Sequence, residues 1–227
     1  MTKRNIYRAC AIGLGFLTLL LSTSVYGAGV VKLATIDGSI NPASADFLIR
    51  AIEQSEADSA AALLIELDTP GGLVSSTKDI IQAMLNSEVP IIVYVAPRGA
   101  WASSAGTFIT VAANIAAMAP GTSIGAAHPV GVGGGSPAGG EGKDGESDKA
   151  RDYSLEKAEN LLAAYMETIA RKRNRNVDWV VDAVRNSVAI GETEALELGV
   201  IDFIAENKRE LLEAVQGRMV ELNDGSE

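Results

Sequence analysis

The sequence predicts a single α/β domain built on a mainly parallel sheet. Its 227 residues, 47% of them hydrophobic, suffice for one sizeable core. Apolar, strand-like segments alternate along the chain with helical segments, and turns containing Gly or Pro separate them. Strand, helix and strand in succession is the pattern of parallel pairing with right-handed crossovers. We therefore expect repeated β-α units.

The first β-α units are expected between residues 30 and 95. Val30–Ile36 is apolar and β-branched, and Asn41 followed by Pro42 is typical of a helix start. Ala62–Leu67 and Ile91–Val95 are continuous apolar runs, which predicts buried strands. Between these two runs, apolar residues at helical spacing predict a helix over 77–85.

The second half of the chain is expected to contain one long helix and several short elements. A segment from 131 to about 150 is rich in Gly and acidic residues and has no apolar periodicity, which predicts a mobile loop. The long helix should begin with Asp152 or Ser154 as N-cap and end in the basic residues at 171–175. The shorter elements are expected at 177–184, 188–190, 200–205 and 208–215.

Residues 1–27 predict a signal peptide or an uncleaved signal anchor. Three basic residues precede the apolar run Ala9–Leu21, and small residues suit a cut before Ala28. The folded domain would then be 28–217. Residues 218–227 would be a tail or the start of a linker to a C-terminal region outside this sequence. This predicts an exported protein on the periplasmic or extracytoplasmic face of the membrane.

Net charge and the counts of Cys and His limit which partners, cofactors and nucleophiles the chain can use. The formal net charge of −10 argues against nucleic acid as a partner. The only cysteine, Cys10, lies in the signal segment, and the chain has a single histidine. No grouping of His, Cys and carboxylates has the spacing of metal ligands, so we expect neither a metal nor an organic cofactor. A hydrolase of this composition would use Ser or Thr as its nucleophile.

Two turns after successive predicted strands suit acyl transfer. Ser104 begins a helix, where free N–H groups and the helix dipole favour a developing anion. Gly71 and Gly72 follow the preceding strand and can present bare N–H groups. Because parallel strands end at the same edge of a sheet, both turns can belong to one site. Position alone fits equally a serine that only caps its helix and an ordinary Pro-Gly turn.

Three motifs occur in a fixed order: DTPGG at 68–72, ASSAGTF at 102–108 and APGTSIGA at 119–126. Together they resemble the NfeD family of membrane-associated, ClpP-class serine proteases, over roughly Val30–Glu206. The resemblance implies the ClpP/crotonase fold. It also implies Ser104 as nucleophile and an oxyanion hole formed by the N–H groups of Gly72 and Ala105, with Gly71 shaping the turn.

The resemblance to family members with a Ser/Lys dyad implies that Lys157 is the general base, because it precedes an Ala-Tyr pair by seven residues. We also expect Lys157 in the first turn of its helix, where the dipole and burial would lower its pKa. On the residues alone, an exposed lysine fits equally well.

His128 is the alternative base. It follows Ser104 by about the interval that separates nucleophile and histidine in ClpP, which uses a Ser-His-Asp triad. No aspartate stands out as its partner, although Asp144, Asp148 and Asp152 are available.

The resemblance further implies an exported serine endopeptidase that cleaves apolar segments of a membrane protein, such as a stomatin-like partner, and a homodimer or larger homo-oligomer. Two other classes of function stay open. One is a crotonase-type acyl-CoA enzyme, which would use the same oxyanion hole with a carboxylate. The other is a non-catalytic ClpP-fold scaffold for a membrane partner, in which Ser104 would not matter.

Overall fold

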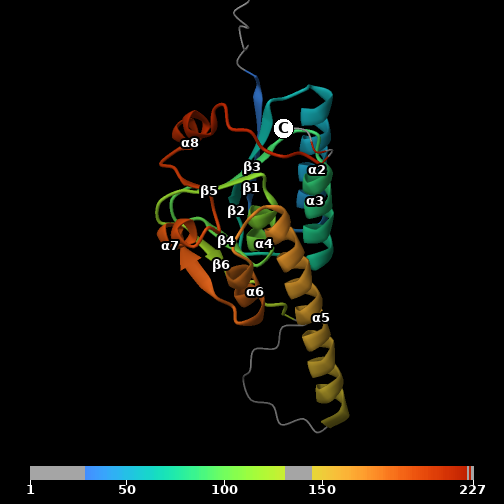
Figure 1. The fold of residues 1–227 in the computed structure, drawn as a ribbon. Coiled ribbons are helices and arrows are strands. Elements are labelled where there is room, and N and C mark those ends of the chain that lie inside the picture. Colours follow the sequence, from blue (N-terminus) through green and yellow to red (C-terminus); the bar gives the residue numbers. More distant parts are fainter. Residues whose placement is uncertain (1–28, 131–144, 224, 226–227) are drawn as a thin grey trace, which may run out of the picture.

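The computed structural model describes residues 29–130, 145–223 and 225, with side chains in the long helix described from residue 153 (Figure 1). The predicted signal segment and residues 131–144 of the predicted loop lie outside the described residues.

The larger sheet has five strands, and every pair in it is parallel. In spatial order they are β1 (Val31–Asp37), β2 (Ala62–Asp68), β3 (Ile91–Val95), β5 (Ile115–Met118) and β8 (Phe203–Ile204). Residues of β3 and β5 are all buried, as expected of continuous apolar runs in a sheet covered on both faces. The mainly parallel sheet with β-α units is therefore confirmed.

Helices cover the two faces of this sheet unequally. The larger core packs one face against α2 (Pro42–Ala57), α3 (Val74–Asn86), α4 (Ala105–Ala112), α5 (Gly145–Lys172) and α6 (Val177–Arg185), with a contribution from α7 (Glu192–Glu197). The smaller core packs the other face against α8 (Lys208–Val215). Figure 1 shows α8 on the side of the sheet opposite to α2, α3 and α5. Alternate residues of each strand point to each core, as the two-residue period requires.

Local sequence explains where α2 begins, but it misplaced the start of two other helices. The side chain of Asn41 accepts hydrogen bonds from the N–H groups of Ala43 and Ser44, which confirms the predicted N-cap. Helix α3 begins at Val74, three residues before the prediction. Helix α5 begins at Gly145, so the N-cap predicted at Asp152 or Ser154 is wrong, and 145–150 belong to a helix rather than a loop. A segment without apolar periodicity can still extend a helix, because each residue added to an existing helix gains one backbone hydrogen bond.

A second sheet of three short strands lies beside the carboxyl end of the first. It contains β4 (Trp101–Ser103), β6 (Ser123–Gly125) and β7 (Ala189–Gly191), with β4 and β6 parallel and β6 and β7 antiparallel. An isolated bridge between Thr69 and Ala102 joins it to the segment after β2. This small sheet leads the chain directly into Ser104. In the described part of the chain, no helix has the length and apolar character needed to cross a membrane.

Candidate active site

Ser104 lies between β4 and α4 with a backbone conformation that L-residues rarely adopt. Its φ is 50° and its ψ is −111°, and although it occupies the N-cap position, its side chain makes no capping hydrogen bond. The interpretation of Ser104 as a helix cap is therefore wrong. Such a conformation costs about 1–3 kcal/mol and persists only where neighbouring structure imposes it. The Oγ is left available for chemistry.

Buried hydrogen bonds beneath Ser104 hold this turn. Its N–H donates to the carbonyl of Gly125 on β6 (3.0 Å). The Oγ1 of Thr107, which is fully buried, lies 2.8 Å from the Gly125 carbonyl and 2.9 Å from that of Ala102, and it accepts from the Gly125 N–H (3.1 Å). One threonine therefore ties the first turn of α4 to two strands of the small sheet, β4 and β6.

The glycine turn after β2 meets Ser104 from the other side. Gly71 has a φ of 119°, and its N–H donates to the Oγ1 of Thr69 (3.1 Å). Gly72 packs closely against Ile40, which follows β1 in the chain. A Cβ on Gly72 would lie 1.9 Å from the carbonyl oxygen of Ile40. The two glycines thus differ: the N–H of Gly71 is already bonded, which suits a residue that shapes the turn.

Two backbone N–H groups beside Ser104 have no acceptor among the described residues, namely those of Gly72 and Ala105. Both residues line the same cleft as Ser104, and Ala105 is the first residue of α4, where N–H groups lack intrahelical partners. Free donors on either side of a nucleophile are what an oxyanion hole needs.

The cleft has a volume of about 500 Å³ and is predominantly apolar. It lies between α3, α4, the segment after β6 and α5. Four of its large apolar side chains are at least 42% exposed: Leu73, Val74, Val130 and Leu161. Exposed apolar side chains gathered around one cleft indicate a binding site for apolar groups.

Lys157 does not line this cleft. Its side chain is exposed and forms no hydrogen bond or ion pair with Ser104 in the part of the chain the structure describes. The expectation that it lies in the first helical turn is wrong, because α5 begins twelve residues earlier. It does share a face of α5 with Leu161 and Tyr165, which line the cleft, so Lys157 lies one turn beyond the cleft wall.

His128 is half-buried and also stands outside the cleft lining, although Ala127, Pro129 and Val130 belong to it. Its Nδ1 lies 3.1 Å from the carbonyl oxygen of Val184. Because a carbonyl can only accept, Nδ1 must carry the proton, and Nε2 has the lone pair in the neutral ring. The group that orients His128 is thus a backbone carbonyl, and the side chains of the aspartates considered as its partner lie outside the described residues.

Two residues that sequence reasoning missed also line the cleft. Lys78 is the single charged residue among the described lining residues; it lies one turn after Val74, a spacing that could have placed it beside the glycine turn. Tyr165 entered the sequence argument only as part of the Ala-Tyr pair that locates Lys157, and burial raises the pKa of its hydroxyl. Within the described residues, no cluster of His, Cys, Asp and Glu could hold a metal ion.

Comparisons with known proteins identify the family of this chain. The family model described as the N-terminal domain of NfeD1b matches residues 30–222. Membrane-bound protease PH1510 of Pyrococcus horikoshii is 35% identical over 214 residues, which are 90% of this chain and 46% of that protein. Membrane protein NfeD1b of Bacillus subtilis is 30% identical over 196 residues, 85% of this chain and 39% of that protein. The chain thus spans less than half the length of these two relatives.

Solved structures of the 1510-N membrane-bound stomatin-specific protease are similar as well. A lysine-to-alanine mutant in complex with a substrate peptide has a TM-score of 0.73 at 35% identity and covers 86% of this chain and 83% of its own. A serine-to-alanine mutant has a TM-score of 0.76 at 34% identity, with 88% and 91% covered. This likeness confirms the ClpP-like α/β fold.

Proposed function

The chain belongs to the NfeD1b family, whose N-terminal domain it matches, and from that membership we propose that it is a serine endopeptidase with Ser104 as nucleophile. One observation carries the proposal: Ser104 adopts a strained conformation, its side chain does not cap the helix, and it lies at an apolar cleft with two N–H groups that have no acceptor among the described residues. A serine with only a structural role has no need of this arrangement.

The proposed reaction is acyl transfer to water. Lys157, as a neutral amine, takes the proton of Ser104, and the Oγ attacks the peptide carbonyl carbon. The N–H groups of Gly72 and Ala105 stabilise the oxyanion of the tetrahedral intermediate. Its collapse breaks the C–N bond, and the protonated lysine returns the proton to the leaving amine. Water, deprotonated by the same lysine, then attacks the acyl carbon. The ester C–O bond breaks, and the lysine returns the proton to the Oγ of Ser104.

Lys157 must reach Ser104 along the cleft wall. It precedes Leu161, which lines the cleft, by four residues, an axial distance of about 6 Å. This distance is comparable to the length of an extended lysine side chain. A modest shift of the exposed part of α5, or the arrival of a substrate that excludes water, would bring the amine into the site.

We further propose that the substrate is an apolar segment of a membrane protein, such as a stomatin-like partner. The apolar cleft supports this choice, and the 1510-N relative is described as stomatin-specific. Export to the periplasmic or extracytoplasmic face of the membrane and assembly into a homodimer or larger homo-oligomer belong to the same proposal.

The decisive experiment is cleavage of an apolar, stomatin-type peptide by the purified chain, followed by mass spectrometry. Ser104→Ala and Lys157→Ala should abolish cleavage, whereas Ser103→Ala, the neighbouring hydroxyl, should leave most of it. Cleavage that survives Ser104→Ala would refute Ser104 as the nucleophile. If the wild-type chain cleaves no apolar peptide, a non-catalytic scaffold is the better description.

His128 is the second candidate base. The bond from its Nδ1–H to Val184 leaves Nε2 as the basic nitrogen, and its neighbours on both sides line the cleft. If His128→Ala abolishes cleavage and Lys157→Ala does not, the enzyme uses a Ser-His mechanism.

A further inference from the structure

We propose that Arg173 and Arg175 are positioning residues for the reaction, because they attach the helix that follows Ser104 to the helix that bears Lys157. The inference rests on the proposed function, since it concerns the geometry of the proposed dyad. It assigns a catalytic consequence to two side chains at the opposite end of α4 from the cleft.

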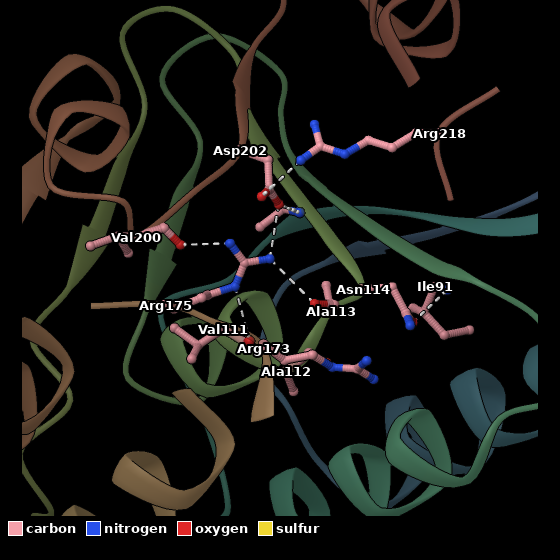
Figure 2. Close-up of polar contacts among 11 residues, drawn as sticks. Ile91, Val111, Ala112, Ala113, Asn114, Arg173, Arg175, Val200, Asp202 and Arg218 are labelled. Carbon is pink, nitrogen blue, oxygen red and sulfur yellow. Dashed lines mark hydrogen bonds and ion pairs between the residues drawn. The ribbon is translucent and has the colours of Figure 1, made fainter. Parts of the chain in front are cut away.

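The two arginines bind three consecutive carbonyls at the C-terminal end of α4 (Figure 2). Arg175 donates through Nε to the carbonyl of Val111 (3.2 Å) and through Nη2 to that of Ala113 (3.2 Å). Arg173 donates through Nε to the carbonyl between them, that of Ala112 (2.8 Å). These carbonyls have no intrahelical partner, so the arginines complete the end of the helix.

The backbone of both arginines is continuous with the last turn of α5. The N–H of Arg173 donates to the carbonyl of Ile169 (3.0 Å), and that of Arg175 donates to the carbonyl of Ala170 (2.8 Å). Asn174, between them, has a φ of 53°, the left-handed conformation typical of a residue that ends a helix. A movement of α5 relative to α4 would therefore have to break side-chain or backbone hydrogen bonds.

Arg175 is also tied to the sheet. It donates to the carbonyl of Val200 (3.1 Å) and pairs with Asp202 (3.0 Å), whose carboxylate also accepts from the N–H of Ala116 at the start of β5 (2.8 Å; Figure 2). Its side chain is only 2% exposed. Burial lowers the pKa of Arg175 and lowers that of Arg173 to about 10, because loss of solvent disfavours the charged form of each guanidinium. A buried ion pair such as Arg175–Asp202 is weak evidence for stability, and we infer that its role here is to define geometry.

The attachment matters because, among the described side chains of α5, the buried ones lie towards its C-terminal end. Its buried residues are Ala163, Met166, Ile169 and Ala170, whereas the described side chains from Tyr153 to Lys157 are all exposed. Lys157 precedes Arg173 by sixteen residues, an axial distance of about 24 Å. At that distance, a tilt of about 2–3° at the attached end displaces Lys157 by about 1 Å. A displacement of that size can cost about 100-fold in rate.

The test uses the full chain and steady-state cleavage of the apolar peptide. Arg173→Met removes the donor to Ala112, and we expect kcat to fall about tenfold or more while KM changes less than twofold. Arg173→Lys should restore part of the rate, and Arg175→Lys, which keeps the charge but loses the planar fork, should lower kcat likewise. Arg171→Met is the matched control, because Arg171 lies in the same turn and, among the described residues, pairs only with Glu167, so the kcat of this variant should not change.

A second measurement is independent of cleavage. Spin labels at Asp79→Cys on α3 and Asn160→Cys on α5, in a Cys10→Ser background, report the distance between the cleft walls. Arg173→Met should shift or broaden the distance distribution, and Arg171→Met should not. An unchanged distribution, or a folded Arg173→Met variant with wild-type kcat, overturns the inference. If wild type and Ser104→Ala have equal activity, the proposed function has failed. The distance distributions then decide by themselves whether the arginines hold α5 against α4.

Discussion

Gly71 lies directly against Ser104. A Cβ on Gly71 would be 2.7 Å from the Cβ of Ser104 and 3.2 Å from its Oγ, so no residue with a side chain fits without displacing the nucleophile. The turn after β2 and the turn after β4 are thus in van der Waals contact. This contact brings the free N–H of Gly72 and the Oγ of Ser104 to one cleft.

Gly71→Ala should therefore damage the site as well as the fold. Its φ of 119° disfavours any side chain, and we expect a loss of about 1–3 kcal/mol in the free energy of unfolding together with a fall in kcat of more than tenfold. Gly38→Ala is the matched control: its φ is 129°, but a Cβ there meets nothing within 4 Å. Urea unfolding should show similar destabilisation in both variants. Peptide cleavage should show a loss of kcat only in Gly71→Ala. Equal kcat values would contradict the steric argument.

Thr107→Val should loosen the turn that holds Ser104. The substitution keeps the shape but leaves the buried N–H of Gly125 without its acceptor, at a cost of about 1–3 kcal/mol. We expect a lower kcat as well, because the same hydroxyl ties α4 to β4 and β6. Thr110→Val, one turn along and equally buried, removes only a bond to the carbonyl of Gly106 within the helix, so it should change kcat little. The prediction fails if the two variants have the same kcat.

Lys78 should favour substrates with an acidic side chain near the scissile bond. It is the only charge among the described cleft residues, and an exposed ion pair is worth about 0.2–1 kcal/mol, or about 1.4- to fivefold in kcat/KM. Competition between peptides that differ by Glu or Gln measures this preference. Lys78→Met should remove it, whereas Lys172→Met, at the far end of α5, should retain it. A preference that persists in Lys78→Met would assign it to another residue.

Tyr94 should make the protein less stable at alkaline pH. Burial, aided by Glu66 and two other carboxylates, raises the pKa of its hydroxyl above 10.0, and that hydroxyl donates to the carbonyl of Ala205 (2.7 Å). Because the folded-state pKa is the higher one, this stabilising contribution is complete below pH 10 and is lost as the pH rises through the folded-state pKa. The free energy of unfolding from urea titrations should fall above pH 10, and Tyr94→Phe should flatten the fall. Parallel pH curves for the two proteins would contradict this.

The β-α organisation could be predicted because its signals are local. Continuous apolar runs mark β2 and β3, and the Asn-Pro pair marks the start of α2. The start of α5 could not be predicted in the same way. Residues 145–152 have no apolar periodicity, and helix propensity alone is a weak guide to where a helix begins.

For the site, the sequence by itself determined which residues follow which strand: Gly71 and Gly72 after β2, and Ser104 after β4, at one edge of a parallel sheet. Only the tertiary structure decided what each group does there. Within the part of the chain that the structure describes, the N–H groups of Gly72 and Ala105 have no acceptor, whereas the N–H of Gly71 donates to the Oγ1 of Thr69.

Tertiary structure also placed Lys78 on the cleft and left Lys157 one turn beyond it. The physical reason is that strand order and turn position follow from local chemistry. Hydrogen-bond partners and exposure depend instead on segments distant in the chain, such as the carbonyls of α4 that meet Arg173 and Arg175 more than sixty residues later.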